Sequence, residues 1–375
     1  MVSEMEGALA GNGGAGGSGT GTKVPAEATA ETAPYFPDNT FTKKEGTIDT
    51  GLVIQDASGN EYVWVVVPRT TAVYKTTGLG KTAFTDADYT SIEKDLKDYT
   101  STYVTRSGYS DTYAADTDNV GWFADATAYN NLKNSMLKSV YENGGFYVGR
   151  YEAGIGTNRT SKSATNSDGK YTIEGMPTPV SKADAYPYTY VTRTQAQNLA
   201  SNVNSGTKTS SLMFGVQWDL VLAFMHNKGN IEDSTLTSNS TTIGNYYNST
   251  FDLNRGKYAQ CGQLGNTWKN FDSALDSIVV SNETTGKMKK TEQNSYQNGI
   301  LLTTGGTEQS KVMNIYDIAG NVYEWTLEKT PNTYEPCVTR GGLFNDTGSY
   351  RPAAEHGGSS SGHSFYSIGF RVSIF

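Results

Sequence analysis

The most reactive side chains in this 375-residue sequence are three histidines, His226, His356 and His363, and two cysteines, Cys261 and Cys337. No serine, cysteine or carboxylate accompanies a histidine in a recognisable catalytic motif, so we interpret the histidines as structural or surface residues. The cysteines are too few for a disulfide scaffold and too widely spaced for a zinc site. Two alternatives stay open for them, a single disulfide or two buried thiols.

A second group of candidate residues is acidic. Asp317 and Glu324 lie in residues 314–325, Asn-Ile-Tyr-Asp-Ile-Ala-Gly-Asn-Val-Tyr-Glu-Trp, and Glu328 follows shortly after. Their carboxylates are of the type that performs acid/base catalysis. Trp325, at the end of the segment, is expected in the core.

Composition and charge narrow the classes of partner. The net charge is −8, and nucleic-acid binding depends on Lys and Arg that neutralise phosphates, so we expect no nucleic-acid partner. Apolar runs such as residues 63–67 are far shorter than the roughly 20 residues of a membrane span, so we predict no membrane span. The 41 glycines and 25 tyrosines favour short strands, turns and contact surfaces over a helical bundle.

The chain divides into a tether and one folded domain. Residues 11–21 are Gly, Ala, Ser, Thr and Asn, and residues 24–34 are mainly Ala, Thr, Glu and Pro, so neither stretch can offset the entropy of ordering. We predict a flexible tether over residues 1–45 and a domain over residues 46–375. The first residues show no secretory signal.

Periodicity predicts the regular elements. Two β-branched runs around the turn residues 56–60 predict a β-hairpin over residues 51–68, and residues 146–152 are typical of a strand. Few helices among short strands indicate an α+β domain. Three helices are predicted from apolar spacing, through Tyr129, Leu132, Met136 and Val140, through Ala196, Leu199, Ala200 and Val203, and through Trp218, Val221, Leu222 and Met225.

Four motifs follow one another in the last quarter of the chain. They are residues 314–325, Arg-Gly-Gly at 340–342, Arg-Pro-Ala-Ala at 351–354 and Ile-Gly-Phe-Arg-Val at 368–372. In this order they resemble the formylglycine-generating-enzyme family, whose members have a C-type-lectin-like fold. Weaker similarity at residues 146–152 and 212–219 extends the resemblance over most of residues 50–375. It implies a C-type-lectin-like α+β domain of the formylglycine-generating-enzyme subfamily.

The sequence departs from that family at the catalytic positions. In the enzymes, two cysteines directly after the Arg-Gly-Gly motif perform the oxidation, but residues 343–350 contain no cysteine here. Cys337 precedes the motif and Cys261 lies far upstream, so the thiolate needed as nucleophile and copper ligand is missing. We therefore expect no enzymatic activity and no required cofactor.

The resemblance also implies a structural calcium site in residues 320–324. Asn321 and Glu324 would supply side-chain oxygens, and Gly320 and Val322 would supply backbone carbonyls. Oxygen ligands of this kind suit Ca²⁺. A hydrogen-bonded turn without metal is the alternative.

The C-terminal segment, residues 340–375, has a restricted composition without Lys, Met, Trp or Gln, although all four occur elsewhere. Randomising both adenines of an asparagine codon yields Asn, Asp, His, Tyr, Ser, Gly, Arg, Leu and Phe but excludes those four. This pattern resembles the variable regions that diversity-generating retroelements produce at the C-terminus of the same lectin-like fold. An ordinary polar loop is the alternative. Glu355 falls outside the asparagine-codon set, so it requires a lysine template codon or is a fixed residue.

A variable region of this kind would act as a paratope, in which rigid aromatic side chains supply contact area and small polar ones supply adaptable hydrogen bonds. The predicted anchors are Phe344, Tyr350, Phe365 and Tyr366, and the predicted charged discriminators are Arg351 and Asp346. The remaining predicted ligand-binding residues are Leu343, Asn345, Glu355, His356, His363 and Ser367. The expected framework residues are Gly341, Gly342, Ile368, Gly369, Phe370 and Arg371.

These features predict a non-enzymatic protein, displayed on a virion or cell surface, that binds a protein or glycan on a target. Two alternatives remain, a formylglycine-generating-type oxidase with displaced cysteines and a structural surface or pilus component. An adenine-rich near-copy of the tail-coding DNA beside a reverse transcriptase gene would separate the first hypothesis from the structural component.

Overall fold

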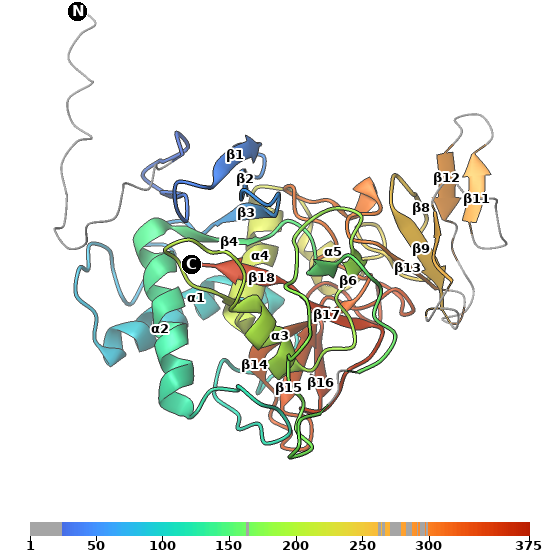
Figure 1. The fold of residues 1–375 in the computed structure, drawn as a ribbon. Helices are drawn as coiled ribbons and strands as arrows, with labels where there is room; N and C mark the ends of the chain where they lie inside the picture. The colour runs from blue at the N-terminus through green and yellow to red at the C-terminus, as the bar shows by residue number, and fades with distance from the viewer. Residues whose placement is uncertain are drawn as a thin grey trace, which may run out of the picture.

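A computed structural model describes residues 25–375 apart from 163–164, 262–263, 265–266, 271–278, 283–286, 291, 293–296 and 298. Across this part of the chain, a few helices lie among short strands that form several small sheets (Figure 1). The mixed α and β content agrees with the predicted class. No helix of the described residues is long and apolar enough to cross a membrane.

The largest sheet has the strand order β1-β2-β3-β4-β18-β7 and brings the C-terminus to its interior. The last strand, β18 (Val372–Ile374), pairs antiparallel with both β4 (Gly145–Gly149) and β7 (Ser210–Leu212). The remaining strands of this sheet are β1 (Thr42–Glu45), β2 (Val53–Gln55) and β3 (Glu61–Val66).

A second sheet has the order β16-β15-β14-β17 and holds the start of the predicted variable region at Arg340 and its residues 356–359 and 368–370. Its strands are β14 (Tyr323–Lys329), β15 (Cys337–Arg340), β16 (His356–Ser359) and β17 (Ile368–Phe370). The strand β14 pairs antiparallel with β15 and parallel with β17. Residues 341–355 and 360–367 are therefore two loops whose ends are fixed by this sheet.

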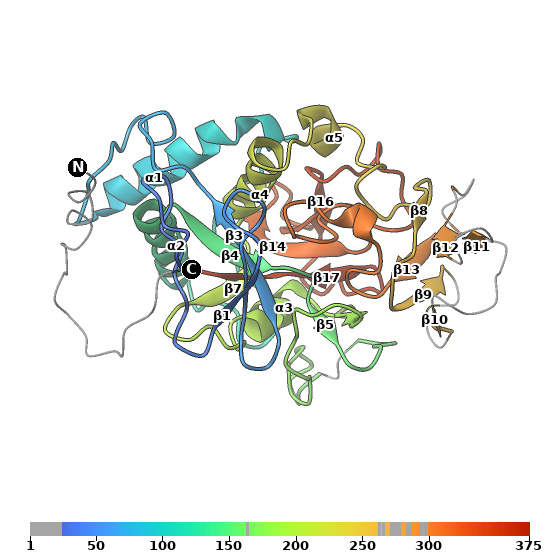
Figure 2. The same ribbon diagram turned by 90° about the horizontal axis from the view of Figure 1, so that it is seen from above.

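Smaller sheets lie at the side of the molecule remote from helix α2 (Figures 1 and 2). Their strands are β8 (Phe251–Asp252), β9 (Lys257–Gln260), β10 (Lys269–Asn270), β11 (Val279–Asn282), β12 (Lys287–Lys290) and β13 (Ile300–Leu302). A separate antiparallel pair is formed by β5 (Gly154–Ile155) and β6 (Tyr186–Pro187).

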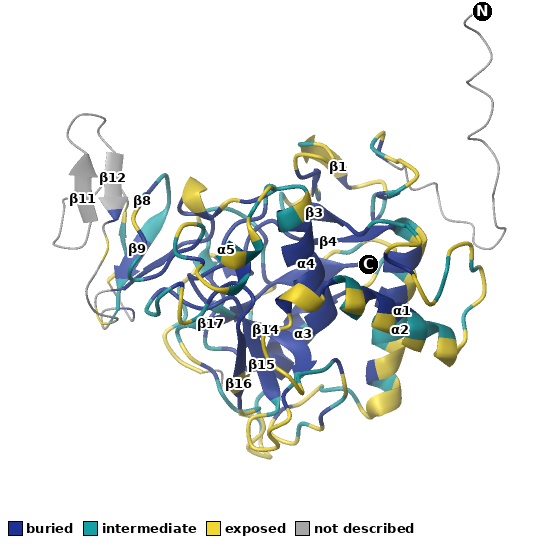
Figure 3. Cartoon of the chain, turned by 180° about the vertical axis from the view of Figure 1, so that it is seen from behind, coloured by how far each residue is buried: buried dark blue, intermediate teal, exposed yellow. Residues whose placement is uncertain are grey.

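The helices are α1 (Asp86–Tyr99), α2 (Ala126–Asn143), α3 (Arg193–Ala200), α4 (Gly215–Asn227) and α5 (Asp233–Thr237), with short 3₁₀ turns at Ser101–Tyr103 and Glu308–Ser310. Helix α4 contacts β3 of the first sheet and β14 of the second. Its residues from Gly215 to Met225 are all buried, so α4 forms the centre of the core that Figure 3 shows in dark blue.

The predicted hairpin and the three predicted helices are present, but α3 ends at Ala200, so Val203, expected on its apolar face, lies beyond the helix. The strands β2 and β3 pair across a turn in which Asp56 Oδ1 accepts hydrogen bonds from the backbone N–H groups of Ser58 and Asn60. Helix α2 ends at Gly144, whose φ of 68° places it in the left-handed region that favours glycine. The strand predicted over residues 146–152 is shorter, because β4 ends at Gly149.

Helix α1 lies inside a polar, tyrosine-rich stretch and, like the short helix α5, was not predicted from the sequence. A capping box marks its start, since the side chain of Thr85 accepts a bond from the backbone N–H of Asp88 while Asp88 accepts one from the backbone N–H of Thr85. Ile92 and Leu96 are fully buried and attach the helix to the core.

The predicted tether extends too far along the chain. Tyr35 and Phe41 are buried in the main core, and the Tyr147 hydroxyl donates a 2.7 Å hydrogen bond to the Tyr35 carbonyl. The ring of Tyr35 also packs edge-on against Trp64, with 5.3 Å between centroids. These aromatic side chains supply the apolar area that residues 11–34 lack, so residues 25–45 belong to the domain. The rest of the predicted tether, residues 1–24, lies outside the described residues.

Candidate ligand-binding surface

The first loop of the predicted variable region starts from a buried, charged framework at Arg340. Its guanidinium lies 2.6 Å from an oxygen of Asp219 on α4 and 3.3 Å from an oxygen of Glu328 on β14. Its Nε also donates to the Glu355 carbonyl at 3.0 Å, which ties the end of the first loop to its beginning. A buried ion pair with additional hydrogen bonds is costly to break, so this end of the loop is held firmly.

Two glycines then turn the chain away from β15. Gly341 and Gly342 have φ values of 90° and 75°. A Cβ on Gly342 would lie 2.3 Å from the Arg351 carbonyl oxygen, so only glycine fits this position. Both glycines are buried, as expected for framework residues.

The other end of the segment is fixed by Arg371, between β17 and β18. Its guanidinium pairs with Glu324 and also donates to the carbonyls of Gly149 at 2.9 Å and Tyr316 at 2.8 Å. Ile368, Gly369 and Phe370 beside it are buried, as expected for framework residues.

Residues 320–324 do not fit a calcium ion. Asn321 Oδ1 already accepts hydrogen bonds from the Asn245 side chain and the Leu302 backbone, each at 3.0 Å. Both carboxylate oxygens of Glu324 bond to Arg371. The two side chains expected to bind calcium are thus committed to protein donors, and among the described residues no group of three or more His, Cys, Asp or Glu side chains is arranged to hold a metal. The hydrogen-bonded turn without metal is the alternative that this geometry favours.

Four of the predicted contact residues are buried. Phe344 has no exposed surface and packs with Leu301 and Val322 in a small apolar cluster, and Leu343 is 8% exposed. His356 is 1% exposed in β16, where its Nδ1 lies 3.2 Å from the Thr105 hydroxyl. These side chains are enclosed by other parts of the protein, so we exclude them from the binding surface.

Glu355 is the fourth buried residue, at 6% exposure. Its carboxylate pairs with Arg106 at 2.6 Å and with Arg351. Because its carboxylate is buried and pairs with two arginines, Glu355 has the surroundings of a fixed residue. A fixed residue is one of the two explanations for a glutamate in this segment, the other being a lysine template codon.

The exposed part of the first loop surrounds a shallow hollow of about 280 Å³ lined by Tyr247, Asn345, Asp346, Thr347 and Tyr350. Tyr350 is 65% exposed, and the Arg351 guanidinium lies over its ring at 4.5 Å. Burial raises the pKa of Asp346, while the positive charge of Arg351 opposes this effect. The hollow is slightly smaller than a typical small-molecule pocket of roughly 300–1,000 Å³, so its size suits a protruding group of a larger ligand.

Tyr323 connects the two loops. Its hydroxyl lies 3.4 Å from Asp346 Oδ2 in the first loop, and its backbone N–H donates to the Ser367 carbonyl of the second loop at 2.9 Å. Tyr366, next to Ser367, lies beside Cys261 and Asn345, and burial together with the adjacent Cys261 raises the pKa of its hydroxyl. The structure therefore brings Asn345, Asp346, Tyr350, Tyr366 and Ser367 onto one continuous surface, together with Arg351.

Phe365 and His363 form a second group on the same loop. Their rings meet edge-on with 4.4 Å between centroids, and Phe365 is 44% exposed. His363 Nδ1 lies 3.1 Å from the Ser359 hydroxyl, which holds the ring over the end of β16. No described contact joins this pair directly to the hollow.

Three residues outside the C-terminal segment contribute to the surface and were not predicted, namely Tyr247, Cys261 and Tyr323. Tyr247 is placed by its backbone N–H, which donates to the Asp346 carbonyl at 3.1 Å. Tyr323 lies within the quoted motif at 314–325, but its side-chain direction depends on β14 pairing with β17. Tyr247 and Cys261 come from a segment far away in sequence, so no local pattern could have identified them.

The two cysteines are free thiols in the structure, which leaves the disulfide alternative without support. Cys337 is buried in β15, and burial raises its pKa to about 11. A thiol protonated at neutral pH is a poor nucleophile and metal ligand. Cys261 is half-buried beside Asn345 and Tyr366.

Comparisons with known proteins gave little further information. No family model matches the chain, and no curated protein matches it. Four chains of solved structures match, and among them is Treponema denticola variable protein 1, with 13% sequence identity over 94% of this chain and 94% of that chain. The TM-score is 0.24, which is too low to establish a shared fold.

Proposed function

We propose that this chain is a non-enzymatic ligand-binding protein with a C-type-lectin-like domain of the formylglycine-generating-enzyme type. Its C-terminal segment is diversified by a retroelement and binds a protein or glycan on a target surface. The protein would be displayed on a virion or on a cell surface.

One observation carries this proposal, the separation of the C-terminal segment into a buried framework and an exposed variable set. Arg340, Phe370 and Arg371 have no exposed surface, whereas Tyr350 and Phe365 are exposed by 65% and 44%. Variation tolerated at exposed positions changes contacts without changing the core, because surface substitutions usually alter stability little. Residues 340–375, with their restricted composition, thus combine exposed positions that can vary with buried positions that hold the fold.

The chemistry of the exposed set supports recognition. Tyr350, Phe365 and Tyr366 supply rigid aromatic area, while Asn345 and Ser367 supply hydrogen bonds that adapt to different partners. Arg351 and Asp346 add opposite charges that distinguish one ligand from another.

The proposal excludes formylglycine synthesis for a chemical reason. That oxidation needs thiolates after the Arg-Gly-Gly motif, and the segment there has Phe344 and Asn345 instead. Cys337 cannot substitute, since its thiol is buried in the sheet.

The test of the proposal is genetic. The DNA around the gene should contain a reverse transcriptase gene and a near-copy of the sequence coding for residues 340–375, with adenines at the codons of Tyr350, Phe365 and Tyr366. The absence of both elements from the complete source genome would contradict diversification.

A further inference from the structure

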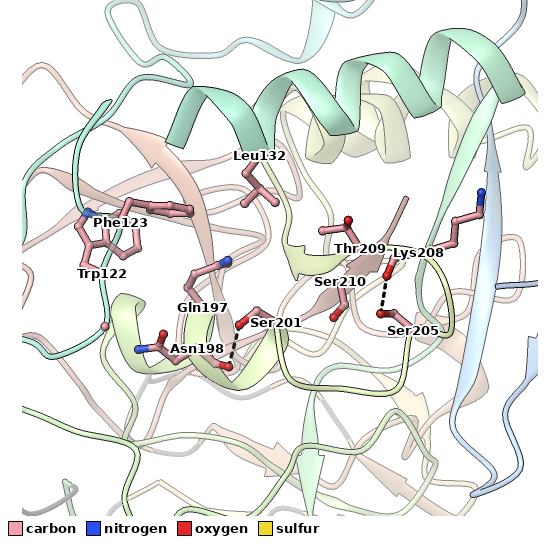
Figure 4. Close-up of a pocket in the computed structure, with 11 residues that line it drawn as sticks. Trp122, Phe123, Leu132, Gln197, Asn198, Ser201, Ser205, Lys208, Thr209 and Ser210 are labelled. Carbon is pink, nitrogen blue, oxygen red and sulfur yellow. Dashed lines mark hydrogen bonds between the residues drawn. The ribbon is translucent and has the colours of Figure 1, made fainter. Parts of the chain in front are cut away.

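A pocket of about 550 Å³ lies away from the C-terminal segment, between the loop at 121–123, α2, α3 and the start of β7 (Figure 4). Its volume falls within the roughly 300–1,000 Å³ of typical small-molecule sites. None of its lining residues belongs to the ligand-binding surface described above.

One side of the pocket is apolar and rigid. Trp122 and Phe123 pack edge-on with 4.8 Å between ring centroids, and Leu132 of α2 is the third apolar side chain of the lining (Figure 4). The Trp122 Nε1–H donates to the Ala114 carbonyl at 2.7 Å, and the Arg193 guanidinium covers the ring at 4.2 Å. These contacts hold the apolar wall in place before any ligand arrives.

The opposite side presents one polar group that the described residues do not satisfy. Ser210 is 4% exposed, and its hydroxyl has no hydrogen-bond partner among the described residues. A buried hydroxyl without a partner is costly, which indicates that a water or ligand completes it.

Gln197 supplies a second oriented donor. It is 7% exposed, and its Oε1 accepts hydrogen bonds from the Leu212 backbone and the Ser211 hydroxyl, each at 3.0 Å. Because the oxygen is fixed by β7, the amide nitrogen points into the space between Phe123 and Leu132 (Figure 4).

The pocket is electrically nearly neutral. Lys208 is the single ionisable residue of its lining, and the Lys208 ammonium lies over the Tyr35 ring at 4.2 Å, turned away from Trp122 and Phe123 (Figure 4). A ligand for this site therefore needs an apolar face for the aromatic wall and uncharged hydroxyl groups for Ser210 and Gln197.

We propose that this pocket binds a neutral sugar ring, with its C–H face against Phe123 and Trp122 and its hydroxyls on Ser210 and Gln197. A hexose combines these features, because one face of the ring carries mainly C–H groups while its edge carries hydroxyl donors and acceptors. The site would be a second recognition site, independent of the diversified surface.

The experiment uses the full chain and the methyl glycosides of glucose, mannose, galactose and N-acetylglucosamine, observed by saturation-transfer difference NMR. At least one glycoside should receive saturation, most strongly at its ring C–H protons. Ser210→Ala removes a hydroxyl that has no partner in the protein, so the fold should be unaffected. One lost ligand hydrogen bond should weaken binding about threefold to tenfold.

A second variant blocks the pocket from its rim. Ser201 is exposed at the end of α3, so Ser201→Trp should fill the opening and abolish the signal. The matched control for Ser210→Ala is Ser91→Ala on α1, where Ser91 is half-buried and its hydroxyl donates to the Ala87 carbonyl of the same helix; this variant should bind as the unmodified protein does. Absence of saturation for every glycoside, unchanged affinity in Ser210→Ala, or binding that survives Ser201→Trp would each overturn the proposal.

A variant of the C-terminal surface keeps this test separate from the proposed function. Replacing Tyr350, Phe365 and Tyr366 by serine should leave glycoside binding intact. Loss of binding in that variant would place the sugar on the diversified surface and overturn the inference about the pocket.

Discussion

The guanidinium of Arg371 donates hydrogen bonds to both carboxylate oxygens of Glu324, from Nη2 at 2.6 Å and from Nε at 3.1 Å. Both residues are almost fully buried, and the pair joins the start of β18 to β14. It connects the end of the C-terminal segment to the turn at 320–324, where the resemblance to the formylglycine-generating family implies calcium.

Breaking this pair should destabilise the protein strongly. In Arg371→Leu, the carboxylate of Glu324 stays buried near Glu152 and Asp317 without its cation, and such losses cost about 3–5 kcal/mol. Urea unfolding measures the effect. The control is Lys94→Leu, which breaks the exposed Lys94–Asp98 pair on α1 and should leave the free energy of unfolding almost unchanged. Equal effects of the two variants would show that the Arg371 pair is not buried.

Calcium should have no effect on stability. The oxygens of Asn321 and Glu324 are occupied by protein donors, so a calcium ion would have to displace existing hydrogen bonds. Melting temperatures measured by calorimetry with excess calcium and with a chelator should coincide. A higher melting temperature in calcium that is abolished by Asn321→Ala would restore the calcium site.

The exposed aromatic residues should be separable from the core by stability and by binding. Replacing Tyr350, Phe365 and Tyr366 together by serine should cost only about 1–2 kcal/mol, because two are exposed and one is half-buried. Phe370→Ser should cost about 3–5 kcal/mol through lost burial and a cavity. Thermal and urea unfolding would distinguish the two variants, and the reverse order would mean that the inner and outer faces of the segment are exchanged.

Binding to target cells, measured by flow cytometry, should be lost in the same triple variant. The control replaces Leu79 and Tyr334, which are 48% and 87% exposed and lie outside the surface, by serine. Both variants remove exposed apolar area, so a specific surface predicts loss of binding only in the first. Loss in both variants would indicate non-specific adhesion.

His356 should give the protein a pH-dependent stability. Burial, with a smaller effect of the Arg340 charge, lowers the pKa of His356 to about 3 from its ordinary 6.5. Between these values the unfolded chain binds more protons, so this contribution to stability is lost as the pH falls from 6.5 towards 3. Its slope is at most about 1.4 kcal/mol per pH unit.

The comparison with His356→Gln isolates this contribution. Asp219 and Glu328 face the same ring, and burial raises the pKa of Asp219 to about 6, so carboxylates titrate in the same range. Subtracting the free energy of unfolding of His356→Gln from that of the unmodified protein at each pH removes most of the contribution of these carboxylates. The unmodified protein should lose stability relative to the variant as the pH decreases, whereas parallel curves would place His356 in contact with solvent.

Patterns among neighbouring residues of the sequence predicted one hairpin and three helices. The hairpin at β2 and β3 follows from the turn at Asp56, and the end of α2 follows from Gly144. The apolar spacing of Trp218, Val221 and Leu222 likewise predicted α4. The capping box formed by Thr85 and Asp88 is an equally local signal for the start of α1, which was not predicted.

Burial within the C-terminal segment could not be predicted in the same way. Phe344 and Phe365 are the same residue type in the same kind of loop, yet Phe344 packs against Leu301 and Phe365 is exposed. The difference arises because β13, distant in sequence, covers Phe344. The commitment of Asn321 to Asn245 and Leu302 is also a long-range contact, so the motif alone could not distinguish a calcium turn from a hydrogen-bonded one.

The central claim is that exposed residues of the C-terminal segment vary while buried ones stay fixed, and sequencing the gene from many individuals of the source population tests it most directly. Amino-acid changes should concentrate at exposed or half-buried positions such as Asn345, Tyr350, Phe365 and Tyr366. Arg340, Phe344, Phe370 and Arg371, which have no exposed surface, should be nearly invariant. Substitutions spread evenly over both groups, or no excess of substitutions in residues 340–375 over the rest of the chain, would contradict the account.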